Sequence, residues 1–414
     1  MTEIAVQPQA YGTAEKQPLS RLTLMVLIVL SVFESVRSNM MLSEVITRFK
    51  DVDIVFFFFF VLRESGYRLN RDFFLKNAYG WMLAFVLLTL PVTYYSINTQ
   101  FGAEIQSTVS LAGASYLRML YFCFLTYVLI EYFHRRPEDG PAMLNIFIIS
   151  CCFFVVFNIV GYFYHFPFMR VFRPHNGRFS SGYPTSDALM LIFAIVALAA
   201  NRAPKEKSDY LQLLLLAVGV VGNVTGSGLI AAVVLSLAYV ALNIKRSPAK
   251  VLSLILAGCV TMAAILGAIF LYLMFYYPKL LKFFLAIGQM RWTSLFTGGG
   301  TIAVRVKEFT DQGKYMEGWL DQLIGVGSRF GFIEIQYAHV FVTWGILGSV
   351  LFLLTIVQNF TMARSGNFQF CLYANLVWII GGGVLVTTYL FPLFVPFALL
   401  MSVSATQRFA AAHA

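Results

Sequence analysis

Arginines that lie between apolar segments are the residues of this chain whose type and spacing best suit chemistry. They form two groups, one within 164–187 and one within 276–337, and the first group is followed by no acidic residue until Asp187. The two groups comprise Arg170, Arg173, Arg178, Arg291, Arg305 and Arg329. Because a planar guanidinium binds two phosphate oxygens at once, they predict a bound polyanion such as a diphosphate. The alternative is that they contact lipid headgroups or cap helix carbonyl groups.

Polar residues next to the second group extend the candidate site. Glu334 and Tyr337 lie just before His339, where the chain enters an apolar stretch. Histidine exchanges a proton near neutral pH, so His339 is a candidate general base, and Glu334 is the other candidate. A lone histidine at such a position also fits a structural role, in which hydrogen bonds hold the ring. Both interpretations of His339 stay open.

The composition predicts a helical membrane protein. Of the 414 residues, 59% are hydrophobic and only 12% are charged, compared with about 25% charged residues in soluble proteins. Basic residues in short loops account for most of the net charge of +10, so no nucleic acid partner is expected. The five cysteines lie in apolar runs, which indicates small core residues rather than disulfides or metal ligands.

Apolar stretches long enough to cross a bilayer recur along the chain. We predict an all-α polytopic membrane protein with about twelve transmembrane helices. The predicted spans are 22–40, 45–62, 78–96, 113–133, 143–163, 187–201, 210–224, 227–244, 251–275, 338–357, 369–388 and 390–405. Basic residues cluster in alternate connections, starting before the first span, which predicts that both termini are cytoplasmic. Both arginine groups then lie outside, where short loops normally carry few Lys and Arg.

The predicted organisation includes one large outer loop with short helices. The predicted parts are a disordered N-terminus at 1–20, spans one to nine within 21–275, the large loop at 276–337, the last three spans within 338–405, and a tail at 406–414. Within the loop, 301–323 has the periodicity of an amphipathic helix that ends at 325–327. Its expected packing positions are Ile302, Val306, Phe309, Trp319 and Leu323. The expected role of this helix is to form the wall or lid of a site. The alternative is that it rests on lipid headgroups and has no part in chemistry.

Several short motifs occur in a characteristic order. Segment 178–187 reads RFSSGYPTSD, segment 223–230 reads NVTGSGLI, and Arg305 is followed by Trp319. Further along come 325–327 (GVG), 337–339 (YAH) and 345–348 (GILG). In this order the motifs resemble the R-x-x-G…P element, the T-x-S-R turn and the C-terminal signature of the bacterial O-antigen polymerase and O-antigen ligase superfamily. The resemblance covers roughly residues 140–350.

The chain departs from the pattern of this superfamily at two positions. Gly228 stands where many relatives have Arg, and His339 is followed by Val340 rather than Asn. His339 also lies closer to Gly345 than the ligase pattern has it. These departures favour a polymerase of repeat units over a ligase.

The resemblance implies a glycosyltransferase of the bacterial inner membrane, with a glycosyltransferase-C-like fold and an active site that faces the periplasm. It implies polymerisation of oligosaccharide repeat units carried on undecaprenyl pyrophosphate, for O-antigen, capsule or exopolysaccharide, by inverting transfer with no metal or cofactor. The implied site is catalytic at Arg178, Arg305, His339 and Glu334 and substrate-binding at Arg170, Arg173, Arg329, Tyr337, Gly182 and Trp319. The expected partners are the lipid-linked oligosaccharide, the lipid bilayer and a chain-length regulator protein.

Two other functions are open. One is an O-antigen ligase that passes glycan to the lipid A core. The other is a lipid-linked oligosaccharide flippase or another secondary transporter, a class in which charged residues lie within the spans. Glu34 and Arg118 are the main examples of such residues here. No internal repeat is visible and the polar residues concentrate in one asymmetric outer loop, which favours an enzyme that works at the membrane interface.

Overall fold

The chain is almost entirely helical in the part that the structure, a computed structural model, describes. This part comprises residues 17–40, 52–65, 77–101, 105–164, 166–169, 179–180, 183–201, 207–223, 225–243, 307, 309–311, 313–314, 316–327, 335–362, 368–385 and 387–406. Within these residues the only extended pairing is an isolated antiparallel bridge between Met40 and Met169. The predicted all-α fold class is therefore confirmed.

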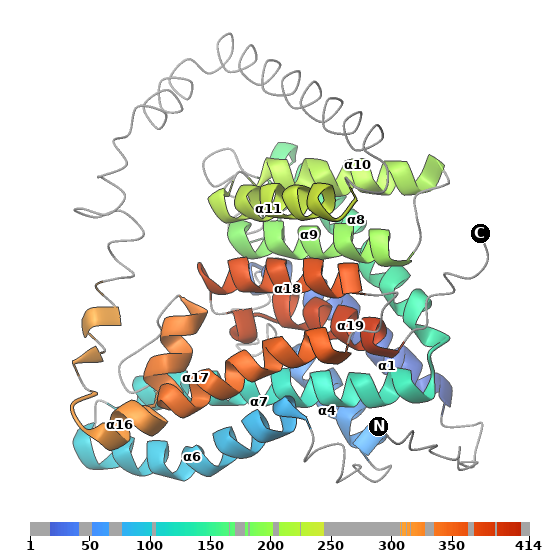
Figure 1. Ribbon diagram of the computed structural model, residues 1–414. Coiled ribbons are helices and arrows are strands. Elements are labelled where there is room, and N and C mark those ends of the chain that lie inside the picture. Colours follow the sequence, from blue (N-terminus) through green and yellow to red (C-terminus); the bar gives the residue numbers. More distant parts are fainter. Residues whose placement is uncertain are drawn as a thin grey trace.

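Helices, both long and short, form the body of the protein (Figure 1). They are α1 (Gln17–Val32), α2 (Glu34–Ser38), α4 (Val52–Ser65), α6 (Ala78–Phe101), α7 (Ile105–Arg135), α8 (Asp139–Phe163), α9 (Pro184–Asn201), α10 (Lys207–Gly222), α11 (Gly226–Asn243), α16 (Trp319–Ile324), α17 (Gln336–Met362), α18 (Phe368–Gly382), the 3₁₀ turn η5 (Thr387–Tyr389) and α19 (Phe391–Thr406). Helices overlap eleven of the twelve predicted spans, and the remaining range, 251–275, lies outside the described residues.

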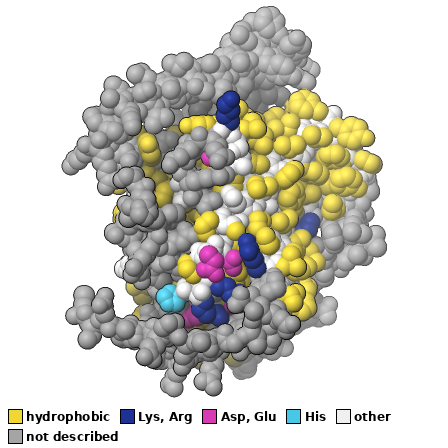
Figure 2. Space-filling view, turned by 90° about the vertical axis from the view of Figure 1, so that its right-hand side faces the viewer, with side chains coloured by type: hydrophobic (Ala, Val, Ile, Leu, Met, Phe, Trp, Pro, Cys, Tyr) yellow, Lys and Arg dark blue, Asp and Glu magenta, His cyan; other side chains and the backbone are white. Residues whose placement is uncertain are grey.

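Three of the described helical segments are long and apolar enough to cross a bilayer. They are Tyr116–Arg135, Asp139–Phe163 and Gln336–Thr361. Shorter apolar helices accompany them, and many of their large side chains are exposed, including Leu88, Leu237 and Phe59. Figure 2 shows hydrophobic side chains spread over a broad part of one face. Water would not tolerate so much exposed apolar surface, so the protein is embedded in a membrane. The number of twelve spans stays a prediction.

The core lies where α7, α9, α18 and α19 meet. Phe122 of α7 stacks on Trp378 of α18 with ring centroids 5.1 Å apart. Trp378 stacks in turn on Phe397 of α19 at 4.3 Å. Aromatic pairs of this kind contribute about 0.5–1.5 kcal/mol each beyond the area they bury. These central helices therefore form a scaffold on which the helix ends and connecting segments are positioned.

Charged residues at the predicted cytoplasmic end pair with one another. Glu64 at the end of α4 lies 3.2 Å from Arg135 and 3.7 Å from Arg136. Asp139 at the start of α8 accepts a hydrogen bond of 2.6 Å from the Tyr132 hydroxyl and lies 3.4 Å from Arg21. The basic residues that predicted the orientation therefore also join α4 to α7 and α1 to α8.

Two predicted spans are interrupted. The range 22–40 divides at Phe33 into α1 and α2, because Phe33 leaves the helical conformation with φ −94° and ψ 18°. The range 338–357 divides at Gly345, whose φ of 65° and ψ of −161° lie outside the helical region. Hydropathy averaged over a whole span does not register a change of backbone direction at a single residue. Both breaks lie near residues considered below.

The predicted helix at 301–323 is wrong as one continuous element. Residues 316–318 are not helical, and Gly318 is extended with φ −93° and ψ 151°. The Gly318 N–H donates to the Asp321 carboxylate at 3.4 Å, so a new helix, α16, begins at Trp319. Trp319 was expected to pack inward but is 75% exposed. The predicted end at 325–327 is confirmed, since α16 stops at Ile324.

Candidate functional site

Three of the ten predicted site residues lie in the described part of the chain, namely Trp319, Tyr337 and His339. The other seven lie outside the described residues. They are Arg170, Arg173, Arg178, Gly182, Arg305, Arg329 and Glu334. Arg291, the remaining member of the arginine groups, also lies outside. The structure therefore bears on the site through the residues that adjoin these positions in the sequence and through the helix ends around them.

The residue that follows Arg178 is anchored to the end of α10. The Phe179 N–H donates to the carbonyl oxygen of Gly222 at 2.8 Å. The Phe179 ring packs edge-to-face on Tyr162 of α8, with ring centroids 5.0 Å apart. A Cβ atom on Gly222 would collide with the Phe179 ring, so glycine is required there. Phe179, the residue immediately after Arg178, thus lies beside both α8 and α10.

A buried polar cluster continues from this anchor into the first turn of α9. The Ser180 hydroxyl donates to the Asp187 carboxylate at 2.7 Å, and both side chains are buried. The neighbouring α10–α11 turn packs on the same helix start, because a Cβ on Gly228 would lie 2.9 Å from the Ala188 Cβ. Further buried polar residues of the two segments are Ser186, Asn223, Thr225 and Ser227. The segments that carry the two motifs therefore adjoin each other, since Phe179 contacts Gly222 and Gly228 packs on Ala188.

The glycine at position 228 has a structural explanation. The Gly228 N–H donates to the Thr225 hydroxyl at 3.3 Å and closes the first turn of α11. A Cβ at Gly228 would lie 2.8 Å from this hydroxyl, which is closer than Cβ atoms normally approach. No side chain fits at this position without a shift of the turn or of α9. Glycine at position 228 is thus required by the packing of this turn against α9.

Sequence reasoning missed the buried polar residues of this cluster. Asp187 was noted only as the first acid after the arginines, and Asn223 only as the start of a motif. The position of Asp187 in the first turn of α9 was a usable signal, because a carboxylate there is stabilised by the helix dipole. Its contact with Ser180 was not predictable from spacing, because it depends on how the intervening loop closes.

A second anchored segment lies where α16 ends and α17 breaks. The N–H groups of Val326 and Gly327 donate to the carbonyl oxygens of Val342 and Thr343 at 2.9 and 3.1 Å. A Cβ on Gly345 would lie 2.5 Å from the backbone of the facing α16 segment. Met316, Val326 and Val342 form a small core beneath this contact. The GVG and GILG motifs are therefore two parts of one backbone-to-backbone contact.

His339 lies on the buried side of α17. Its side chain is 2% exposed, and its ring meets the Trp344 ring edge-to-face with centroids 6.0 Å apart. Trp344 packs in turn on Tyr116 of α7 at 5.2 Å. The histidine is thus held inside the helix bundle, one turn before the carbonyl groups that anchor 326–327. The proposed role of His339 as a base stays a prediction.

The first turn of α17 is tied to the last turn of α18 and to the connection between α18 and α19. The Tyr337 hydroxyl donates to the carbonyl oxygen of Ile379 at 2.8 Å. The buried Gln336 side-chain oxygen accepts hydrogen bonds from the Thr388 N–H at 3.1 Å and from its hydroxyl at 3.0 Å. These bonds fix the start of α17, and with it the helix that carries His339.

Two ion pairs are buried around α2. Arg37 lies 3.3 Å from Asp53, and the two side chains are 6% and 0% exposed. Glu34 lies 3.8 Å from Arg118 of α7, whose guanidinium also lies 4.2 Å from the centre of the Phe391 ring. The two charges that the sequence placed inside spans therefore pair with each other. They join α2, α7 and the start of α19.

The helix ends described above define what we call the predicted outer end, where α8, α10 and α18 finish and where α9, α11, α17 and α19 begin. The described residues at this end supply hydroxyl, amide and carboxylate groups together with the imidazole of His339. Among the residues that the structure describes, no three His, Cys, Asp or Glu side chains form a group that could hold a metal ion. No protein-family model and no curated protein matches this chain.

Proposed function

We propose that this protein polymerises oligosaccharide repeat units carried on undecaprenyl pyrophosphate, at the periplasmic face of a bacterial inner membrane. A hydroxyl group of the acceptor sugar attacks the anomeric carbon of the donor glycan and forms the new C–O bond. The bond from this carbon to the diphosphate oxygen breaks, and undecaprenyl pyrophosphate leaves with the electron pair. The hydroxyl proton passes to a general base. The anomeric configuration inverts in such a single displacement.

The observation that carries the proposal is that segments adjoining the arginines are anchored at the predicted outer end. Arg178 directly precedes Phe179, which is bonded to Gly222 at the end of α10. Arg329 follows Gly327 by two residues, and Gly327 is bonded to Thr343 of α17. Both anchors are made by backbone groups and glycine contacts that permit little variation. The segments next to Arg178 and Arg329 are thus each bonded to another helix, one to the end of α10 and the other to α17 just before its break.

The chemistry of the proposed reaction needs positive charge rather than a redox group. Negative charge builds up on the diphosphate as its bond to the sugar breaks, and guanidinium groups stabilise that charge. One donor aimed at developing charge is worth about 3 kcal/mol in characterised enzymes. We assign this role to Arg178 and Arg305, with Arg170, Arg173 and Arg329 binding the diphosphate before the reaction. His339 and Glu334 are the candidate bases.

A transporter of lipid-linked oligosaccharide is the second candidate, and the buried ion pairs favour it. Ionisable residues within membrane spans are costly and often mark a path for protons or substrate. Arg37 with Asp53 and Glu34 with Arg118 meet this description. These pairs also suit a structural role, since they fix α2 against α4 and α7. Uptake of labelled lipid-linked oligosaccharide into sealed vesicles, with no elongation, would favour the transporter.

The experiment that tests the proposed function is deletion of the gene, followed by gel analysis of surface polysaccharide. A lost polymerase leaves single-repeat glycans, whereas a lost ligase leaves uncapped core with long chains still on the carrier lipid. Complementation with Arg178→Ala should fail to restore long chains. Complementation with Arg21→Ala, a half-exposed arginine at the opposite end, should restore them. Long chains of normal length in the deletion strain would refute the proposal.

A further inference from the structure

Three helices approach one another closely just inside the predicted outer end. A Cβ atom on Gly219 of α10 would lie 2.5 Å from the side chain of Val155 in α8 and 2.7 Å from the side chain of Leu191 in α9. Real Cβ atoms do not approach other atoms so closely, so α10 packs directly against both other helices at this level. This contact fixes how α8, α9 and α10 are aligned with one another.

Polar residues occupy the next turn outward on all three helices. Residues three or four positions apart share a face of an α-helix. One turn from the Gly219 contact toward the predicted outer end, the helices therefore carry Asn158 of α8, Asp187 of α9 and Asn223 directly after α10. Each of these three residues is 1% exposed. Two amides and one carboxylate are thus buried at the same level of the junction of the three helices.

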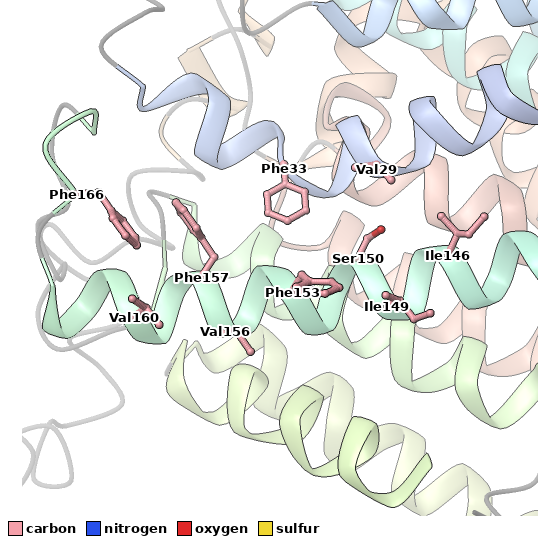
Figure 3. A pocket seen from close by; sticks show the side chains of 10 residues that line it. All are labelled: Val29, Phe33, Ile146, Ile149, Ser150, Phe153, Val156, Phe157, Val160 and Phe166. Atoms are coloured by element: carbon pink, nitrogen blue, oxygen red, sulfur yellow. The ribbon is translucent and has the colours of Figure 1, made fainter. Parts of the chain in front are cut away.

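Two faces of α8 differ in what they contact. One face lines an apolar groove between α1 and α8, and Asn158 is not part of that lining (Figure 3). Asn158 instead shares a face with Tyr162, whose ring meets the Phe179 ring with centroids 5.0 Å apart. The Phe179 N–H in turn donates to the carbonyl oxygen of Gly222 in α10. Asn158 therefore lies on the side of α8 that is turned to α10.

The two buried amides each have an oxygen without a hydrogen-bond partner among the described residues. The Asn223 Nδ2 donates to the carbonyl oxygen of Gly219 at 2.8 Å, which leaves the Asn223 Oδ1 directed away from that carbonyl group. Neither this oxygen nor the Asn158 Oδ1 accepts a hydrogen bond within the part of the chain that the structure describes. Buried oxygens of this kind normally bind a water molecule or an ion. The junction therefore has two oxygens that are suited to a small ligand.

The chemistry of these groups favours a monovalent cation. Asp187 lies in the first turn of α9, where the helix dipole stabilises the ionised carboxylate. The Ser180 hydroxyl donates to this carboxylate at 2.7 Å and keeps lone pairs with which it can bind a cation. Carboxylate, amide and hydroxyl oxygens are hard ligands, and oxygens at helix ends hold Na⁺ in membrane transporters. One carboxylate balances one positive charge, whereas a divalent ion would leave a net charge buried.

We propose that Asn158, Ser180, Asp187 and Asn223 form a binding site for Na⁺. The ligands are the two amide oxygens, the carboxylate and the hydroxyl group. The ion joins α8, α9 and the end of α10 to Ser180, and so holds the segment that follows Arg178. It takes no part in glycan transfer, and the inference does not depend on the proposed function. Chelators of divalent ions do not remove Na⁺, so the site is compatible with transfer that survives chelators.

The test measures binding of radiolabelled Na⁺ to the purified full-length protein in nanodiscs, without any lipid-linked substrate. Unlabelled Na⁺ should displace the label at millimolar concentration, and K⁺ should do so at least tenfold more weakly, because the helices pack too closely for a larger ion. Choline should not displace it. Saturating NaCl should also raise the Tm by about 2–4 °C relative to choline chloride of equal concentration. Absence of saturable Na⁺ binding, or a Tm that is the same in both salts, would overturn the proposal.

Asp187→Asn removes the charge of the site at nearly constant size. It should abolish saturable Na⁺ binding and the rise of Tm in NaCl. Asp209→Asn is the matched control, because Asp209 is also 1% exposed and lies in the first turn of a helix, α10, at the opposite end. This control should keep both responses to Na⁺. Retention of Na⁺ binding in Asp187→Asn, or equal loss in the two variants, would overturn the proposal.

Asn158→Asp tests the same site by a gain of response, in case Asp187→Asn does not fold. A second carboxylate beside Asp187 should convert the site from Na⁺ to Ca²⁺, because Ca²⁺ sites use several carboxylate oxygens. Ca²⁺ should then raise the Tm of Asn158→Asp at least as much as Na⁺ raises that of the wild-type protein. The wild-type protein should show no such response to Ca²⁺. Equal responses of the two proteins to Ca²⁺ would contradict a site at Asn158.

Discussion

Gly345→Ala is expected to separate the segment at 325–327 from the break in α17. Gly345 has φ 65° and ψ −161°, a region that is almost restricted to glycine and costs other residues about 1–3 kcal/mol. The new methyl group would also lie 2.5 Å from the Gly325 nitrogen and from the carbonyl group of Leu323. Forcing a methyl group into such a contact costs about 1–3 kcal/mol more. The contact should therefore weaken by at least about 2 kcal/mol.

Hydrogen–deuterium exchange measures this contact directly. In the wild-type protein the amides of Val326 and Gly327 are bonded to Val342 and Thr343, so their exchange requires local opening. A loss of about 2 kcal/mol corresponds to exchange about thirtyfold faster, since 1.4 kcal/mol is a factor of ten. Amides in the centre of α7 should be unaffected and serve as an internal reference.

Gly313→Ala is the matched control, because nothing lies within 4 Å of a Cβ at that position. This variant should keep the exchange rates of the wild-type protein at 326–327. Unchanged protection of these two amides in Gly345→Ala would refute the argument that the two glycine motifs form one contact.

Four further predictions concern the site and the buried charges. Arg178→Ala and Arg305→Ala should each abolish long-chain polysaccharide while the protein still accumulates in the membrane; chains of normal length in either strain would remove these residues from the leaving-group role. Turnover by the purified protein should survive chelators, and a loss that a divalent ion restores would contradict metal-free transfer. His339→Ala should lower kcat if the ring is the base, and an unchanged kcat would make it structural. Arg118→Ala removes a cation that lies 3.8 Å from the largely buried Glu34 and should destabilise the protein by about 3 kcal/mol in thermal unfolding, more than the double variant with Glu34→Gln; equal stability of Arg118→Ala and wild type would contradict this.

The helices were largely predictable from the sequence, because long apolar runs must satisfy their backbone hydrogen bonds internally within a membrane. The breaks at Phe33 and Gly345 were not, since each depends on the conformation of one residue. At Gly345 the facing glycine segment supplies the reason, and a contact between distant segments leaves no periodic signal. Gly318 was a visible break in 301–323, and ignoring it put Trp319 on the wrong side of the helix.

The candidate site was predictable in its residue types and less so in its contacts. The arginine groups were apparent from composition, although their positions fall outside the described residues. The pairing of Glu34 with Arg118 follows from the cost of burying single charges, but their distance in sequence hid it. The contact between Asp187 and Ser180 was the hardest to predict from the sequence, because a segment with Gly and Pro separates the two residues.

We propose that this chain transfers glycans from a polyprenyl diphosphate donor at its predicted outer end. The most direct measurement is incubation of the purified protein with a synthetic undecaprenyl pyrophosphate-linked oligosaccharide, followed by mass spectrometry of the products. We expect glycans of two or more repeats on the carrier lipid, with one released undecaprenyl pyrophosphate for each new linkage, and neither product with Arg178→Ala. Intact donor after incubation with folded wild-type protein, or equal elongation by Arg178→Ala, would contradict the account.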